Sequence, residues 1–230
     1  NKSLVMKRIL KQHCLLVLLL TIVFANGTFA QAALKDFFNN SEAPLTYLGV
    51  DFTKAKLIND PGANTMDIRN RLYEAINDVV VGEPKKYMIG DAFHKSNVTS
   101  DLSAVKAQNS KINAEQIASS NLEDFNRLKE ADISAVVKSL GISRKSGVGL
   151  LFVVEAMKKV NKDDKKSKEK DMAAIWITLI DLDSKKVLLT ERVECKAAGF
   201  GFRNYWASTI KEAIDEASDR YKGWKKQYGG

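Results

Sequence analysis

The amino-acid sequence predicts a single α/β (or α+β) domain, with a mixed sheet of four to five strands, helices packed on it and a long C-terminal helix. Three observations predict this class. A continuous apolar run at 148–154 is typical of a strand covered on both faces. Two β-rich runs at 173–182 and 186–194 flank a short polar turn, as in an antiparallel hairpin. Apolar residues recur at helical spacing from Trp206 to Trp224.

The chain begins with the pattern of a secretory signal peptide, which we expect to span residues 1–32. A basic start without acidic residues precedes an apolar run from Leu15 to Ala25, and small residues follow at Ala30 and Ala32. The apolar run is shorter than the roughly 20 residues that a bilayer-spanning helix needs, so a membrane anchor is the less favoured alternative. We therefore expect an exported protein, periplasmic or extracellular, with no permanent membrane anchor after signal cleavage.

The remaining chain is expected to have a flexible lead at 33–44 and a single α/β domain at 45–230. Asn64 is placed to cap a helix that ends near Gly82, and Pro84 follows. Residues 96–128 give the weakest pattern. In chain order, the expected elements are strand 45–52, helix 64–82, short helix 85–95, short strand 98–102, helix 132–140, strand 148–154, hairpin strands 173–182 and 186–194, and helix 205–226.

The charge of the chain gives little support for a nucleic-acid partner. There are 36 Lys and Arg residues against 28 Asp and Glu, but the signal segment holds four of the bases and none of the acids. The remaining excess is small, whereas nucleic-acid-binding proteins usually cluster basic residues on one face. The lysine-rich segment 158–170 is interleaved with acidic residues and lacks aromatic residues for base stacking. We interpret it as a solvated loop, with a basic arm for a polyanion as the alternative.

Few residues could carry nucleophilic or metal chemistry. After the signal segment the sequence has one histidine, His94, and one cysteine, Cys195. A zinc site needs at least about three nitrogen, sulfur or carboxylate ligands at suitable spacing, and we expect no metal site and no cofactor. A serine triad could use only His94, and no Gly-x-Ser-x-Gly turn exposes a serine. Cys195 is expected to be a small buried side chain, and the protein is expected not to be an enzyme.

The segment between the last strand and the last helix is the candidate binding site. Gly199 and Gly201 free the backbone to bend around Phe200, and Arg203 arrives where a helix begins. Exposed amides at a helix start favour an anion, and an arginine can clamp a carboxylate or phosphate there. The alternative is a tight connection in which Phe200 and Phe202 are core residues and Asn204 caps the helix. The candidate binding residues are Gly199, Phe200, Gly201, Phe202, Arg203 and Asn204.

Three segments carry a resemblance: Gly149–Glu155, Asp181–Arg192 and Gly199–Trp206. Over most of the mature chain, the sequence resembles an uncharacterised family of exported bacterial envelope proteins, and this resemblance implies export without a particular chemistry. The order of elements is also similar to small α/β envelope modules. Examples are the amino-terminal domain of the Tol-system β-propeller protein, the curli-secretion lipoprotein and the penicillin-binding-protein activators. Those modules bind other proteins, so the likeness implies a binding role.

The sequence therefore predicts a non-catalytic accessory or protein-binding module of the cell envelope, with another envelope protein as its partner. Two alternatives stay open. The first is an enzyme that uses Arg203, Glu155 or a carboxylate other than Glu155 in a pocket near 199–206. The second is a carrier of a small anionic or lipidic ligand. A deep pocket lined by perturbed carboxylates would favour the enzyme, and a dry closed cavity would favour the carrier.

Overall fold

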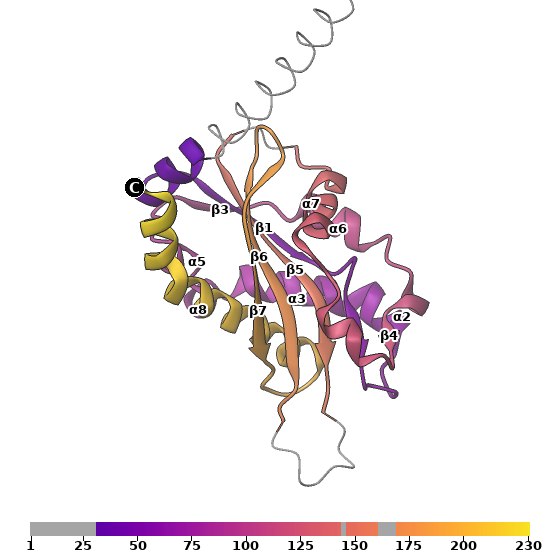
Figure 1. The fold of residues 1–230 in the computed structure, drawn as a ribbon. Helices are drawn as coiled ribbons and strands as arrows, with labels where there is room; N and C mark the ends of the chain where they lie inside the picture. Colours follow the sequence, from indigo (N-terminus) through magenta and orange to yellow (C-terminus); the bar gives the residue numbers. More distant parts are fainter. Residues whose placement is uncertain (1–30, 144–145, 161–168) are drawn as a thin grey trace, which may run out of the picture.

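The computed structural model describes residues 31–143, 146–160 and 169–230, and the centre of the fold is a seven-stranded sheet (Figure 1). The predicted signal peptide lies almost entirely within residues 1–30, outside the described residues. Along one edge of β5 (Val148–Lys158) runs β6 (Met172–Asp181), and β6 pairs in turn with β7 (Lys186–Lys196). Both pairings are antiparallel, which confirms the predicted hairpin.

The other edge of β5 is occupied by two short parallel strands in line, β1 (Leu45–Asp51) and β2 (Lys56–Ile58). β3 (Val98–Ser100) pairs in parallel with β1, and β4 (Ala118–Ser119) pairs in parallel with β2. The sheet is mixed, as predicted, but it has seven strands rather than four to five. The difference arises because two positions across the sheet are each divided into two short strands.

Helices cover both faces of this sheet, with α8 and α5 on one side and α6 and α7 on the other (Figure 1). The helices and helical turns are 31–39, α2 (Thr65–Asp67), the π-helical η1 (Ile68–Leu72), α3 (Tyr73–Gly82), α4 (Pro84–Tyr87), α5 (Ile89–Ala92), α6 (Ser103–Asn109), the 3-10 turns η2 (Ala114–Gln116) and η3 (Leu122–Asn126), α7 (Glu130–Ser139) and α8 (Phe202–Tyr228). None of the described helices is both long and apolar enough to cross a bilayer.

Alternation along the central strand divides the core into two layers. Leu150, Phe152 and Val154 of β5 belong to the cluster shared with α3 and α8. Leu151 and Val153 belong to the second cluster, which includes residues of α6 and α7. β5 is therefore covered on both faces, as its continuous apolar sequence predicts. The three layers confirm the α/β class, and α8 is the predicted long C-terminal helix.

Two buried asparagines complete the edge of β1 beyond the end of β3. The pairing with β3 stops at Tyr47. Asn77 of α3 then accepts a hydrogen bond from Val50 N at 2.7 Å and donates to Val50 O at 3.0 Å, as a neighbouring strand would. Asn109 of α6 donates to the same oxygen at 2.9 Å and accepts from Phe52 N at 2.9 Å. Side chains from two helices thus satisfy buried strand backbone that would otherwise lack partners.

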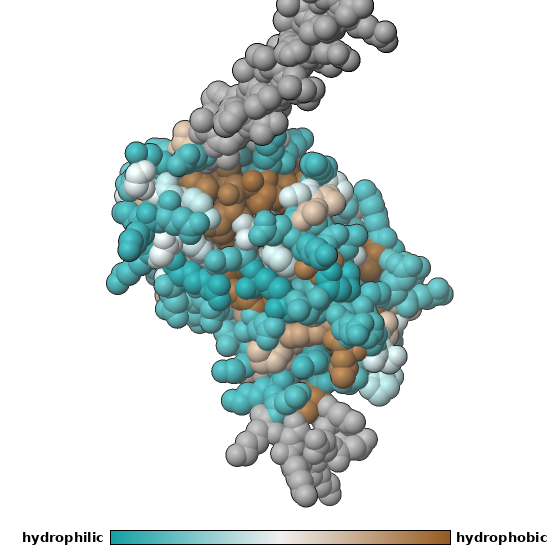
Figure 2. Space-filling view, in the orientation of Figure 1, coloured by the Kyte–Doolittle hydropathy of each residue, from teal (hydrophilic) through white to brown (hydrophobic). Residues whose placement is uncertain are grey.

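β7 forms one edge of the sheet, because among the described strands it pairs only with β6. Its two ends carry exposed charged side chains, Lys186 at one end and Glu194 and Lys196 at the other. Figure 2 shows a largely hydrophilic surface with an apolar area at the upper end of the sheet, between α8 and α7. Charged side chains on an edge strand disfavour pairing with another chain, so the edge is protected by charge.

The predicted flexible lead at 33–44 is wrong. Residues 31–39 form a helix, and Leu34, Phe37 and Phe38 are buried in the main core. The ring of Phe38 contacts that of Tyr221 on α8, with centroids 5.4 Å apart. Residues 34, 37 and 38 have helical spacing, but the segment is too short for that pattern to identify a helix by itself.

A buried lysine fixes this N-terminal helix to the segment that follows α5. Lys95 is only 6% exposed, and its Nζ donates to the carbonyl oxygen of Phe37 and, at 2.8 Å, to that of Asn40. The same ammonium group lies 4.1 Å from the centroid of the Phe37 ring. Burial lowers the pKa of Lys95 to about 8, although nearby Asp36 acts in the opposite direction and Lys225 adds to the lowering.

This lowered pKa predicts a pH dependence of stability. Between pH 8 and 10.5 the lysine is protonated in the unfolded chain and largely neutral in the folded one, so the free energy of unfolding should rise with pH. The steepest rise should be about 1.4 kcal/mol per pH unit. Denaturant titrations from pH 7.5 to pH 10 would measure it as the difference between wild type and Lys95→Met. A difference that stays flat would contradict the lowered pKa, because the two carbonyl hydrogen bonds would then be holding the ammonium form.

Candidate functional site

The loop between β7 and α8 presents an aromatic side chain to solvent. Phe200 is 92% exposed, more than any other large apolar side chain of the described residues. Gly199 and Gly201 flank it with φ angles of +115° and +74°, a region that residues with a Cβ rarely adopt. The prediction that the two glycines let the backbone bend here is confirmed. The alternative in which Phe200 is a core residue is wrong.

Hydrogen bonds hold the chain on both sides of Phe200. Ala198 N donates to Ser208 Oγ at 2.8 Å, which ties the start of the loop to the second turn of α8. The Tyr205 hydroxyl donates to Asp171 Oδ2 at 2.7 Å, which ties the first turn of α8 to the residue before β6. The exposed ring therefore projects from backbone that is anchored at both ends.

A hollow of about 440 Å³ adjoins the exposed ring. The rings of Tyr205 and Trp206 meet edge to face in its wall, with centroids 5.3 Å apart. Trp206 is 2% exposed, and its Nε1 has no hydrogen-bond partner within the described residues. The hollow is lined by Lys159, Asp171, Phe200, Gly201, Phe202, Tyr205 and Trp206. Aromatic side chains thus make up most of the lining of this hollow.

Arg203 and Asn204 lie exposed in the first turn of α8, and Arg203 Nε donates to Asn204 Oδ1 at 3.0 Å. The residue at the N-cap is Gly201, and no side chain caps the helix, so the alternative in which Asn204 is the cap is wrong. Phe202 is partly buried and packs against the core. The structure therefore places all six predicted binding residues in one loop and helix start, with Phe200 and Arg203 directed to solvent.

The charges around the hollow do not form an anion clamp. Lys159 is paired with Asp60 at 2.6 Å. The carboxylate of Asp171 lies in the wall and accepts hydrogen bonds from the Tyr205 hydroxyl and, at 2.8 Å, from Val160 N. A carboxylate in the wall repels an anionic ligand, and the exposed Arg203 is not among the residues that line the hollow. Within the part of the chain that the structure describes, the lining of the hollow therefore offers no unpaired cation to an anionic ligand.

Glu155, the carboxylate named in the enzyme alternative, belongs to a buried structural ion pair. It is 0% exposed, and its Oε2 accepts from Arg192 Nε at 2.9 Å and from Trp176 Nε1 at 3.1 Å. Its Oε1 accepts from the backbone N–H groups of Arg127 at 2.5 Å and Leu128 at 2.6 Å. A carboxylate held by four donors in the interior is not available to a substrate, so Glu155 is a structural residue.

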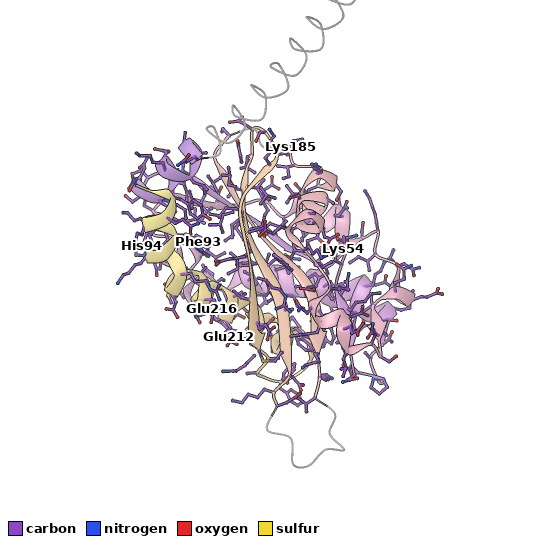
Figure 3. All side chains as sticks on the ribbon, viewed as in Figure 1. Lys54, Phe93, His94, Lys185, Glu212 and Glu216 are labelled. Carbon is purple, nitrogen blue, oxygen red and sulfur yellow. The ribbon has the colours of Figure 1, made fainter. Side chains whose placement is uncertain are left out.

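His94 and Cys195, the histidine and the cysteine that follow the predicted signal peptide, contact structural elements of the fold. His94 is exposed beside α8, and its ring lies 4.2 Å from that of Tyr221 (Figure 3). Cys195 is buried near Glu212 and Glu216, and burial raises the pKa of its thiol, so the unreactive protonated form is favoured. This confirms the prediction of a small buried side chain. Within 31–143, 146–160 and 169–230, no three His, Cys, Asp or Glu side chains are grouped to hold a metal ion.

Four residues of the hollow were not among the predicted binding residues: Tyr205 and Trp206, which follow them directly in sequence, and Lys159 and Asp171, which come from another part of the chain. Lys159 and Asp171 lie on either side of segment 161–168, which is outside the described residues, as is most of the lysine-rich segment interpreted as a loop. The signal that could have located them is the register of the β5–β6 pair, in which Lys158 pairs with Met172. That register brings the end of β5 and the start of β6 together, and Ala197 N donates to Asp171 O at 2.9 Å.

The fold and the site define an α/β protein with an exposed aromatic loop. No protein-family model matches the chain, and no curated protein is similar to it in sequence. Among solved structures, it is similar to a crystal structure described as a homolog of the neuraminyllactose-binding hemagglutinin, from Helicobacter pylori. The identity is 8% and the TM-score 0.37, over 83% of this chain and 88% of that one. A likeness this weak supports no conclusion about the function of this chain.

Proposed function

We propose that this protein is a non-catalytic binding module of the bacterial cell envelope that contacts another envelope protein through the loop at 199–204. The observation that carries the proposal is Phe200, which is 92% exposed between two glycines on an anchored backbone. Exposing a large aromatic ring to water has an unfavourable free energy that a partner's apolar pocket would remove. Export to the periplasm or the extracellular space is the part of this proposal that rests on the sequence pattern at 1–32.

Arg203 gives the proposed contact a second anchor. It lies three residues from Phe200, is exposed and has no acidic partner among the described residues. Aromatic residues and arginine are enriched at the centres of protein interfaces, where a few side chains supply most of the binding free energy. The partner surface that fits is an apolar pocket with an acidic group at its edge.

The test is photocrosslinking in the native cell envelope, with a photoreactive benzoylphenylalanine in place of Phe200. The matched control places the same residue at Leu122, which is 60% exposed on η3 at another part of the surface. We expect one protein to be crosslinked from position 200 and not from position 122. Equal crosslinking patterns from the two positions, or no specific product from position 200, would contradict the proposal.

Alanine variants measure the strength of the contact. Phe200→Ala should reduce recovery of the crosslinked partner at least tenfold in a pull-down, because an anchor residue contributes about 2 kcal/mol or more. Leu122→Ala should leave recovery unchanged. Both variants should keep the unfolding free energy within about 0.5 kcal/mol of wild type, since each removes an exposed side chain. Loss of the partner in both variants would point to a general defect and count against the loop.

A further inference from the structure

A second hollow, of about 540 Å³, lies on the opposite edge of the sheet from β7, between β3 and the helices α3, α4 and α5. None of its lining residues belongs to the 199–204 loop. They are Tyr47, Val80, Val81, Pro84, Lys85, Tyr87, Met88, Ile89, Gly90, Asp91, Val98 and Ser100. The volume is within the range of about 300–1,000 Å³ that is typical of small-molecule sites.

One of the residues that line this hollow, Tyr47, carries a buried hydroxyl group without a partner in the described structure. Tyr47 of β1 is 0% exposed, and its Oη has no hydrogen-bond partner among the described residues. The neighbouring phenol differs, because the Tyr87 hydroxyl donates to Ala207 O at 3.4 Å. A buried polar atom without a partner is costly and uncommon in folded proteins, so a group that pairs with the Tyr47 hydroxyl would be stabilised there.

Two large apolar side chains are exposed at this hollow, beside the exposed polar residues Lys85, Asp91 and Ser100. Val81 at the end of α3 is 38% exposed, and Met88 between α4 and α5 is 46% exposed. These are two of the five large apolar side chains that the described structure leaves exposed, and both line this hollow. Apolar residues gathered at the entrance of a concave site favour an apolar ligand.

The charged residues in the lining of the hollow limit the ligand further. Its charged residues are Lys85 and Asp91, one of each sign, and both are exposed. Burial raises the pKa of Tyr47 and of Tyr87, so both phenols are neutral near pH 7. No buried cation or anion is present in the lining to compensate a ligand charge. A carboxylate or ammonium taken into this interior would lose its hydration without a counter-charge.

We propose that this hollow is a binding site for a small, neutral, mainly apolar molecule that carries one hydroxyl or carbonyl group, which pairs with the hydroxyl of Tyr47. The apolar body of the ligand contacts the side chains of Val80, Ile89 and Val98. No residue of the 199–204 loop lines this site, so either proposal can fail without the other.

Binding of three matched probes to the full chain would test this site. 2-Naphthol is neutral at pH 7 and carries a hydroxyl, naphthalene lacks the hydroxyl, and 2-naphthoate carries a charge. Binding is measured by NMR of the protein methyl groups. We expect 2-naphthol to bind saturably and to shift the methyl signals of Val80, Val81 and Val98. Naphthalene should bind roughly threefold to tenfold more weakly, the range of a single hydrogen bond, and 2-naphthoate more weakly still.

Two variants identify the groups responsible. Tyr47→Phe removes only the unpartnered oxygen, so the fold should be retained and the preference for 2-naphthol over naphthalene should disappear. Val81→Trp should block the mouth and abolish binding of both probes, whereas Leu122→Trp, at an exposed position elsewhere, should leave binding unchanged. The proposal is overturned if 2-naphthol does not saturate, if Tyr47→Phe keeps the preference, or if the methyl groups of Val80, Val81 and Val98 do not shift on binding.

Discussion

Replacement of Glu155 with alanine is expected to lower the free energy of unfolding by about 3–5 kcal/mol, the range for breaking a buried ion pair on one side. The change would remove the acceptor of four hydrogen bonds, two from the side chains of Arg192 and Trp176 and two from backbone N–H groups. Arg192 is only 19% exposed, so water can replace little of what its guanidinium group loses.

A control is available on the same arginine. Arg192 Nη1 also pairs with Glu194 Oε1 at 2.7 Å, but that carboxylate is 50% exposed. Glu194→Ala should therefore cost no more than about 1 kcal/mol. Urea denaturation at pH 7, followed by circular dichroism, would compare the two variants. A cost for Glu155→Ala that is within 1 kcal/mol of the Glu194→Ala cost would show that Glu155 does not hold this part of the fold, contrary to our expectation.

The position of Glu155 explains why the loss of a single carboxylate is expected to lower the free energy of unfolding so strongly. The register between β5 and β6 shifts between Val154 and Ala156, so Glu155 lies in a bulge that interrupts the ladder. The Glu155 side chain extends to the segment between η3 and α7, where its carboxylate accepts hydrogen bonds from the backbone N–H groups of Arg127 and Leu128. It thereby attaches a segment with little regular structure to the centre of the sheet.

The parts of the fold predicted correctly are those whose burial is periodic in sequence. The stripe from Trp206 to Trp224 faces the sheet on α8, and the run at 148–154 is covered on both sides. At both places the neighbouring residues alone indicate which side chains are removed from water. The bend at Gly199 and Gly201 was predictable for a similar reason, since positive φ is a local property that glycine tolerates.

The parts that were missed depend on partners distant in sequence. Residues 96–128 contain α6, η2, β4 and η3, which are short and are held by contacts such as Asn109 with Val50 and Arg127 with Glu155. The helix at 31–39 depends on Lys95 and Tyr221. At the candidate site, sequence located the loop but not Asp171, because its place beside Tyr205 follows from strand register.

Replacement of Asn77 with alanine is expected to lower the free energy of unfolding by about 2–4 kcal/mol. Asn77 is 0% exposed, and its loss leaves the N–H of Val50 without its acceptor on a buried strand edge and removes one of the two side-chain donors to the C=O of Val50. Each buried polar group left unsatisfied costs about 1–3 kcal/mol. Asn70→Ala, at an exposed position on η1, is the control and should stay within about 0.5 kcal/mol of wild type.

The aspartate variant separates hydrogen bonding from volume. Asn77→Asp fills the same space but can only accept when ionised, so it keeps the bond from Val50 N and faces Val50 O with a second oxygen. If hydrogen bonding holds this edge, aspartate should be at least as destabilising as alanine at pH 7. If filling the space is what matters, aspartate should be close to wild type, and the strand-like role of Asn77 would be refuted.

Asn109 allows the two asparagines to be tested as a unit. Both donate to the carbonyl oxygen of Val50, at 3.0 Å from Asn77 and 2.9 Å from Asn109, so either can partly satisfy it alone. The cost of the double alanine variant should therefore differ from the sum of the single costs by about 0.5–3 kcal/mol, as is found for residues that share a partner. The double variant should exceed that sum, because only it leaves the oxygen without either donor. Strict additivity in a double-mutant cycle would mean that the two helices support the β1 edge independently.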